Sequence, residues 1–244
     1  MDGLKREGLD VAYHITNGET PIHYYNSDPN SQQIAEVNQS AQTIHTEDWR
    51  AYLAVIEKAF DENILVTING NLPMGAPADG FHQIIKSAHA KSIPVVLNIS
   101  TPNLSSTLAT NPWGIRLSQP FGSQLEDLKS NLPETILSMA TSYLDIGGEW
   151  IVIDNHNQGV YLVTHDHAWR ALLTSIMNSS YSSGNEDVML AGFLYSLMRK
   201  ESYTQSLGFA LAAAAANACQ PGAGVLSTDA VVKFRPSVFI QQLR

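Results

Sequence analysis

Cysteine is nearly absent from this chain of 244 residues, and Cys219 is its single example. One thiol cannot build a disulfide framework or a cysteine-rich metal site within one chain, so the sequence favours a reducing, cytoplasmic setting. Cys219 closes an alanine-rich stretch and has no activating neighbour in the sequence. We therefore predict that it is a small core residue without chemistry of its own.

Positive charge is scarce as well. The chain carries 14 Lys and Arg against 23 Asp and Glu, which gives a formal net charge of −9. Binding to DNA or RNA depends on clustered Lys and Arg that neutralise phosphates, and the basic residues of this chain are scattered. We therefore expect no nucleic-acid partner.

Long apolar runs are also missing. The longest, residues 209–218, is mostly alanine and falls well short of the roughly 20 residues that a membrane-spanning helix needs. The first residues lack the apolar run of a secretory signal, so we expect no membrane partner. With 44% hydrophobic residues, the chain can still form one large domain with a small appendage.

The first part of the chain alternates apolar and polar residues with the period of a β-strand. Residues 11–15 and 22–25 show this alternation, and Asn17-Gly18 between them is a common hairpin turn. Two or three strands are expected, with residues 34–38 as the third. Such a small hairpin buries too little surface to be stable alone, so we expect it to pack on another surface.

From Thr46 onward, helical and strand patterns alternate. Thr46 is the expected cap of the first helix. Apolar periodicity predicts helices at residues 46–60, 79–91 and from Pro133, and strands at residues 64–68, 95–99, 114–117, 150–153 and 160–163. The last third is expected to be helical, at residues 187–200, 204–219 and 228–234. This order predicts an α/β fold with a mostly parallel sheet covered on both faces, whose ligands bind at the carboxyl ends of the strands.

The most informative motif is Gly184-Asn185-Glu186-Asp187, which opens a predicted helix. Backbone N–H groups at a helix N-terminus can hold a phosphoryl group, and a carboxylate at the same turn can accept the proton of a substrate hydroxyl. Aspartate is also a favoured helix cap, so the motif by itself leaves a structural role open.

The surrounding residues add a resemblance to a known family. Residues 180–195 resemble the Gly-Ala-Gly-Asp signature and following helix of the PfkB, or ribokinase-like, carbohydrate kinases. Residues 67–75 are similar to the Ser-Gly-Ser-Leu-Pro-x-Gly strand end of that family. Gly18-Glu19-Thr20-Pro21 resembles the Gly-Glu-Thr-Arg of the β-lid in the branch that handles fructose-1-phosphate and tagatose-6-phosphate.

The resemblance implies a ribokinase-like three-layer α/β/α sandwich with a small β-lid. Residues 8–45 would form the lid and residues 46–244 the nucleotide-binding core. Family members begin with a strand and a Gly-Gly segment that precede the lid, so the N-terminal strands of the sheet are expected to be missing here. The lid is expected to mediate a homodimer.

The resemblance also implies an ATP-dependent kinase that acts on a sugar phosphate, with Mg²⁺ bridging the nucleotide phosphates and no protein-bound metal. Asp187 would be the catalytic base. The residues expected to contact the nucleotide or its phosphates are Gly184, Asn185, Glu186, Ser118, Asn155 and Gly159. Gly70, Asn71 and Thr20 would lie on the substrate side.

Several positions depart from the family pattern. Ser118 replaces an asparagine, His156 the first glycine of a phosphate loop, and Pro21 the lid arginine. Glu186 replaces a glycine and would place a negative charge beside the transferred phosphate. At about 4 Å and an effective dielectric of about 20, this repulsion is on the order of 4 kcal/mol, or about a thousandfold in rate.

These departures predict a kinase with impaired or absent activity. The alternatives are a non-catalytic pseudokinase that serves as a scaffold, and a regulator that binds a sugar phosphate or nucleotide.

Two further features have ordinary structural interpretations. His165-Asp166-His167 falls between strand patterns, and a hairpin turn is favoured over a metal site because no further ligand is spaced to join it. Pro221-Gly222-Ala223-Gly224 resembles a phosphate loop only superficially, and in the family this stretch at best contacts the nucleotide.

Overall fold

The computed structural model describes residues 2–27, 34–39, 42–60, 65–98, 109–118, 133–155, 159–174, 181 and 183–244 of the chain. It consists of two compact units. The N-terminal unit comprises Met1–Val66 and Asn71–Val95, and the C-terminal unit comprises Thr67–Gly70 and Val96–Arg244. The expected division into a lid at residues 8–45 and a core at residues 46–244 stays a prediction.

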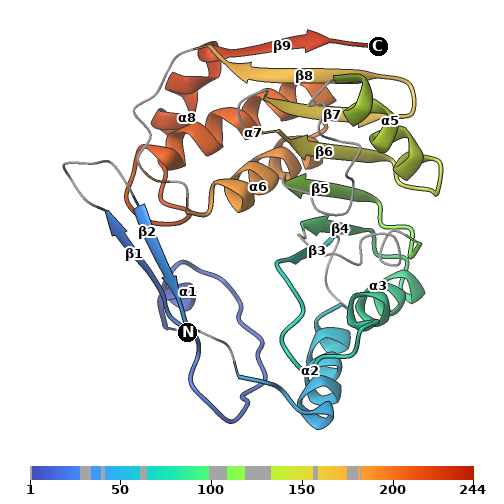
Figure 1. The fold of residues 1–244 in the computed structure, drawn as a ribbon, viewed down its shortest axis with the longest axis vertical. Helices are drawn as coiled ribbons and strands as arrows, with labels where there is room; N and C mark the ends of the chain where they lie inside the picture. The colour runs from blue at the N-terminus through green and yellow to red at the C-terminus, as the bar shows by residue number, and fades with distance from the viewer. Residues whose placement is uncertain are drawn as a thin grey trace. The chain divides into compact units, whose positions relative to one another are not determined.

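A seven-stranded sheet is the main feature of the fold, in the order β3-β4-β5-β6-β7-β8-β9 (Figure 1). Strands β4, β5 and β6 are parallel, whereas β6 to β9 are successively antiparallel. The bounds are β3 Val66–Asn69, β4 Val95–Asn98, β5 Gly114–Ser118, β6 Trp150–Asp154, β7 Val160–Thr164, β8 Ala168–Leu173 and β9 Val238–Gln242. The expected α/β pattern is confirmed. The strand predicted at residues 64–68 corresponds to β3, and residue 64 lies outside the described residues.

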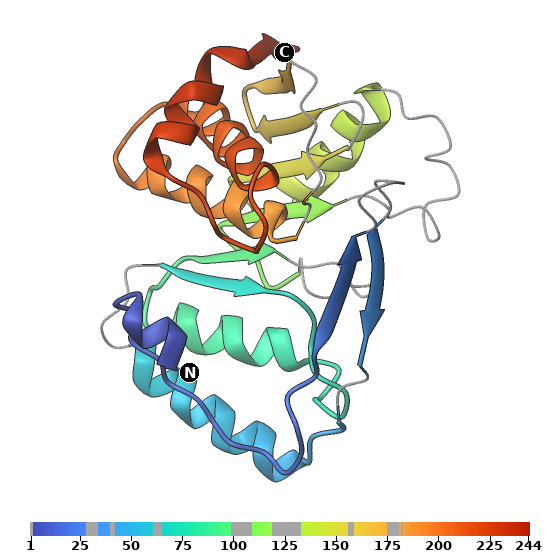
Figure 2. The same ribbon diagram turned by 90° about the vertical axis from the view of Figure 1, so that its left-hand side faces the viewer.

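Helices of the C-terminal unit cover both faces of its strands. In Figure 2 the orange helices α6 (Asn185–Met198) and α7 (Tyr203–Ala218) lie on one side, and the yellow-green α5 (Pro133–Leu144) lies on the other. The ring of Trp150 in β6 packs 4.9 Å from that of Phe193 in α6. A Cβ on Gly114 would come within 2.0 Å of the Trp150 ring, so a side chain at this β5 position is excluded.

The last strand was not expected from the sequence. Helix α8 (Thr228–Phe234) and a 3-10 turn (Arg235–Ser237) lead into β9, which pairs with β8 through five residues. The side chains of β9 are half-buried or exposed. Such a strand at the edge of a sheet lacks the apolar run that reveals a buried strand. The three helices predicted for the last third are confirmed as α6, α7 and α8, but the strand that follows them was missed.

Helices α2 (Thr46–Ala59) and α3 (Gly80–Ala90) are the two longer helices described in the N-terminal unit. The indole of buried Trp49 donates a 2.8 Å hydrogen bond to Gln83 between them. The N-cap of α2 is His45 rather than the expected Thr46, and its backbone N–H donates to Asp48. A further hydrogen bond, from His14, is the main cause that lowers the pKa of Asp48.

The N-terminal hairpin differs from its prediction. The antiparallel pair is formed by β1 (His23–Ser27) and β2 (Ile34–Asn38), with His23 opposite Asn38. Residues 11–15 form no strand, although their alternation predicted one, and a short helix α1 (Asp2–Arg6) precedes them. The dimer expected through this hairpin stays a prediction. Among the described residues, no helix has the length and apolar character needed to cross a lipid bilayer.

Candidate active site

The carboxyl ends of the parallel strands bring three polar side chains to one face of the sheet. Asn98 ends β4 and is aligned with Arg116 of β5, which is aligned with Val152 of β6. Asp154 ends β6, two residues beyond Val152, and therefore shares its face because side chains alternate along a strand. Trp150 of the same face packs on α6. The three polar residues thus face the helix that carries the predicted motif.

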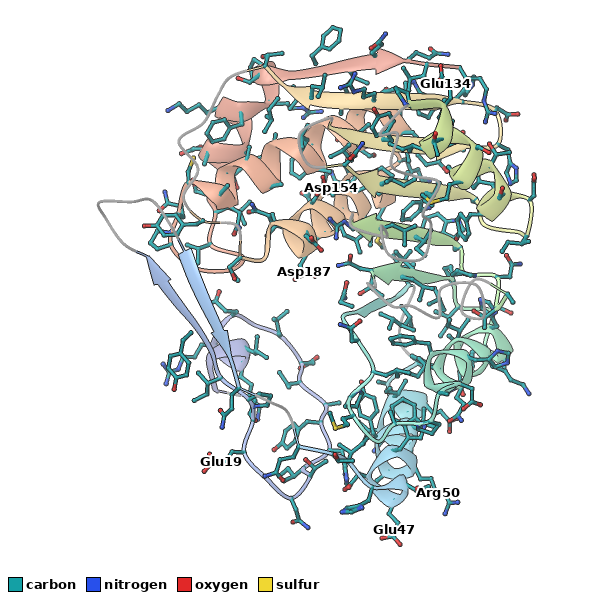
Figure 3. All side chains as sticks on the ribbon, in the orientation of Figure 1. Glu19, Glu47, Arg50, Glu134, Asp154 and Asp187 are labelled. Atoms are coloured by element: carbon teal, nitrogen blue, oxygen red, sulfur yellow. The ribbon has the colours of Figure 1, made fainter. Side chains whose placement is uncertain are left out.

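The first turn of α6 supplies the other half of the site. Gly184 is the N-cap and adopts a left-handed backbone conformation with φ of 73°. Glu186 and Asp187 are the acidic residues of the first helical turn. Figure 3 labels Asp187 at this helix start and Asp154 at the end of β6. Negative charge at this end of a helix is favourable because the backbone dipoles point their N–H groups toward it.

A buried arginine joins the two halves. Arg116 is only 1% exposed, and its guanidinium contacts both strand-end partners and the helix. Nη1 donates to Asn98 Oδ1 at 3.2 Å and to a carboxylate oxygen of Glu186, and Nη2 donates to Asp154 Oδ2 at 3.2 Å. Its Nε is buried without a hydrogen-bond acceptor among the described residues.

Asp187 is held by the same network without being enclosed by it. Asn98 Nδ2 donates to Asp187 Oδ1 at 2.9 Å, while Asn98 Oδ1 accepts from Arg116. The contact with Arg116 fixes which side of the Asn98 amide faces Asp187, because guanidinium is only a donor. Asp187 itself is exposed. The site therefore presents an oriented carboxylate to a ligand at the N-terminus of α6.

Glu186 is not the isolated charge that the sequence led us to expect. Its carboxylate pairs with Arg116, which offsets part of the repulsion toward a phosphate. The cluster nevertheless contains three carboxylates, those of Asp154, Glu186 and Asp187, around one guanidinium. The site thus keeps an excess of negative charge on the side where a phosphate would approach.

A buried asparagine of α7 ties the motif to the glycine loop that follows α7. Asn217 is fully buried, and its Nδ2 donates to the Ser183 carbonyl at 3.0 Å and to Asn185 Oδ1 at 2.6 Å. Its Oδ1 accepts from the backbone N–H of Gly224 at 2.9 Å. The loop at residues 221–224, predicted to be of minor interest, therefore lies directly against the turn at Gly184.

Gly184 and Gly224 allow a matched test of this contact. Both have φ near 74°, but a Cβ on Gly184 would lie 2.8 Å from Ala223 Cβ, whereas a Cβ on Gly224 meets nothing within 4 Å. We expect Gly224→Ala to lower the free energy of unfolding by about 1–2 kcal/mol through its backbone conformation alone. Gly184→Ala should cost clearly more, as measured by urea denaturation. Equal losses would contradict the packing of the two loops.

The other predicted site residues lie in several different parts of the structure. Asn155 and Gly159 bound the turn between β6 and β7, where the Asn155 N–H donates to the Gly159 carbonyl at 3.0 Å. Gly70 lies beside the site, because its N–H donates to the Asn98 carbonyl at 2.9 Å. Asn71 and Thr20 belong to the N-terminal unit and are exposed. The side chain of Ser118 and all of His156 lie outside what the structure describes.

Sequence reasoning missed the residues that organise the site, namely Asn98, Arg116, Asp154 and Asn217. One signal could have found Arg116. An arginine within the apolar run of residues 114–117 must find acidic partners if that strand is buried.

The histidine motif and the single cysteine carry no site. His165-Asp166-His167 forms the turn between β7 and β8, where the Thr164 N–H donates to the His167 carbonyl at 2.8 Å. In the part of the chain that the structure describes, no group of three or more His, Cys, Asp or Glu is placed to hold a metal ion. Cys219 is exposed. The prediction of a core cysteine was wrong because Cys219 lies just past the end of α7.

Comparisons with known proteins agree with this architecture. A family model described as pfkB family carbohydrate kinase matches residues 1–230. The chain is 24% identical to a 1-phosphofructokinase of Haemophilus influenzae over 91% of the chain and 71% of that protein. It is 22% identical to a 1-phosphofructokinase of Bacillus subtilis over 98% of the chain and 77% of that protein.

Among solved structures, the tetrameric inhibited form of phosphofructokinase-2 from Escherichia coli superposes with a TM-score of 0.82. It is 19% identical to the chain, and the match covers 96% of the chain and 76% of that structure. The expected ribokinase-like α/β fold is confirmed.

Proposed function

Because the chain belongs to the pfkB family of carbohydrate kinases, we propose that it binds ATP and a phosphorylated ketohexose and transfers the terminal phosphoryl group slowly. The observation that carries this proposal is the placement of Asp187. The carboxylate is exposed, oriented by Asn98 and set in the first turn of α6.

Asp187 acts as the base in this reaction. It accepts the proton of the substrate hydroxyl as that oxygen attacks the terminal phosphorus of ATP, and the bond to ADP breaks. The N–H groups at the start of α6 stabilise the charge on the transferred phosphoryl group. Gly184 supplies the left-handed backbone conformation of this turn and, having no side chain, leaves room for Ala223 to pack against it.

The excess of carboxylates explains why the transfer is slow. Arg116 balances one of the charges of Asp154 and Glu186, and Asp187 adds another. The negative phosphate groups of ATP must approach this cluster. The expected penalty is smaller than the thousandfold predicted for an isolated Glu186, since repulsion is reduced by a buried positive charge nearby.

We expect Mg²⁺ to enter with the nucleotide. The carboxylates of Asp154 and Glu186 are bonded to Arg116, and among the described residues no group of three or more His, Cys, Asp or Glu is placed to hold a metal ion. Mg²⁺ commonly binds substrate phosphates and keeps several waters, so it neutralises phosphate charge without an all-protein site.

The relatives suggest which sugar to test first. Both curated relatives are named 1-phosphofructokinase, so fructose-1-phosphate is the first substrate to examine and tagatose-6-phosphate the second. Gly70, Asn71 and Thr20 are the residues proposed to contact the sugar. Gly70 is linked by its backbone to Asn98, which also orients Asp187.

The test is a product assay with purified protein, Mg·ATP and each sugar phosphate. We expect phosphorylated sugar to form well below the about 1–100 s⁻¹ of typical kinases. A rate within that range would contradict impaired transfer. Complete absence of product, with both ligands shown to bind, would instead favour the second candidate function.

That second candidate is a non-catalytic protein that binds a sugar phosphate or nucleotide. The observation that favours it is the pairing of Glu186 with Arg116, which places a carboxylate at the turn where phosphate is expected. Binding measured by calorimetry without any product would support this alternative.

A further inference from the structure

The contact between Glu186 and Arg116 has the form of a site filled by the protein's own side chain. We propose that Glu186 is a displaceable internal ligand of Arg116, and that a phosphate group takes its place on the guanidinium. This inference rests on the proposed function, because it assumes that a phosphate group of the nucleotide or of the sugar phosphate approaches the first turn of α6.

Arg116 is the fixed member of the pair. It is 1% exposed and is anchored by Asn98 and Asp154 at the ends of β4 and β6. Its Nε has no acceptor among the described residues. A buried guanidinium with a donor still unsatisfied favours additional acceptor oxygens.

Glu186 is the partner that can move. Its side chain is 45% exposed, compared with 23% for that of Asp154, and it extends from the first turn of α6. Water can therefore solvate the Glu186 carboxylate once it leaves Arg116. The buried guanidinium is not left without an anion in this exchange, because the incoming phosphate takes the place of the Glu186 carboxylate.

A phosphate group suits the position on the Arg116 guanidinium that Glu186 would leave. Arginine binds phosphate through paired N–H donors, and the N-terminus of α6 adds backbone N–H groups and a favourable dipole. A phosphate monoester carries more negative charge than a carboxylate. While Glu186 occupies the guanidinium, the apparent phosphate affinity is reduced by the fraction of molecules in which the site is open.

The experiment compares two variants that each remove one negative charge from the same turn. Inorganic phosphate, ADP and fructose-1-phosphate are titrated separately into the wild-type protein, Glu186→Gln and Asp187→Asn by isothermal titration calorimetry. Glu186→Gln should bind at least one of these ligands about tenfold more tightly than the wild type, because the neutral amide competes less well for Arg116. Asp187→Asn should gain no more than about threefold, because Asp187 is bonded to Asn98 rather than to Arg116.

The titrations also identify the source of the phosphate. A gain for ADP alone assigns Arg116 to the nucleotide, and a gain for fructose-1-phosphate alone assigns it to the sugar. Equal gains for Glu186→Gln and Asp187→Asn would show a general effect of charge and overturn the proposal. No gain for any ligand with Glu186→Gln would overturn it as well.

A second variant tests the guanidinium itself. Adding Arg116→Lys to Glu186→Gln keeps the positive charge but removes the paired donors, and should return the affinity toward the wild-type value. Circular dichroism confirms that the double variant is folded. These readouts need no turnover, so tighter binding without product would leave this inference standing while the proposed catalysis fails. Product formation without tighter binding by Glu186→Gln would leave the proposed catalysis standing and overturn this inference.

Discussion

Replacing Asp187 by asparagine is expected to lower kcat for sugar-phosphate phosphorylation by about a thousandfold. A positioned base contributes about 10²–10⁴ in rate, and asparagine cannot accept the proton. The substituted side chain would keep nearly the same shape, and its amide oxygen could still accept from Asn98. The KM values for ATP and the sugar phosphate should therefore change little, as measured by an assay coupled to ADP release.

Glu134 provides a matched control for this variant. It is an exposed carboxylate in the first turn of α5, on the face of the sheet opposite to α6 (Figure 3). Glu134→Gln should leave kcat within about twofold of the wild-type value, since its charge is remote and screened by solvent. If Asp187→Asn kept more than a tenth of the wild-type kcat, Asp187 would not be the base.

The position of Asp187 could be predicted because its signals are local. Gly184 precedes an apolar helical pattern, and the acidic residues Glu186 and Asp187 follow Asn185, which together mark a helix start. The structure begins α6 one residue after Gly184. The strands predicted at residues 95–99, 114–117 and 150–153 correspond to β4, β5 and β6, and they were predictable for a similar reason, since buried parallel strands form short apolar runs.

Weaker local signals gave wrong predictions. Residues 11–15 alternate like a strand, yet the structure pairs residues 23–27 with 34–38 instead. A segment with alternating apolar and polar residues forms a strand only when a second strand pairs with it. The sequence does not show which segments pair. The edge strand β9 was missed because its half-exposed side chains do not form an apolar run.

The charge balance of the site could not be predicted because it depends on long-range pairing. Arg116 meets Glu186 across 70 residues of sequence and Asp154 across 38. Both contacts follow from the alignment of β5 with β6 and from the packing of α6 on their shared face. The resemblance in sequence led us to expect Glu186 at a glycine position of the family, but the sequence does not show that an arginine on a neighbouring strand pairs with this carboxylate.

Replacing Arg116 by methionine is expected to lower the free energy of unfolding by about 1–3 kcal/mol. The buried guanidinium donates several hydrogen bonds, and its removal leaves their acceptors unpaired, although the partly exposed carboxylates regain some contact with water. Asp154 and Glu186 would lose the guanidinium that they share, and Asn98 would lose the donor that orients its amide. Urea denaturation followed by circular dichroism measures the change as a lower midpoint at constant slope.

The exposed pair of Arg235 and Glu201 provides the comparison. Its atoms lie 3.8 Å apart and its side chains are 46% and 33% exposed, so Arg235→Met should cost no more than about 1 kcal/mol. Adding Glu186→Gln to Arg116→Met should recover part of the loss, because it removes one of the two carboxylates that had shared the guanidinium. A loss below about 1 kcal/mol for Arg116→Met would mean that Arg116 does not hold the site together. If the double variant were no more stable than Arg116→Met, the loss would come from packing rather than from charge.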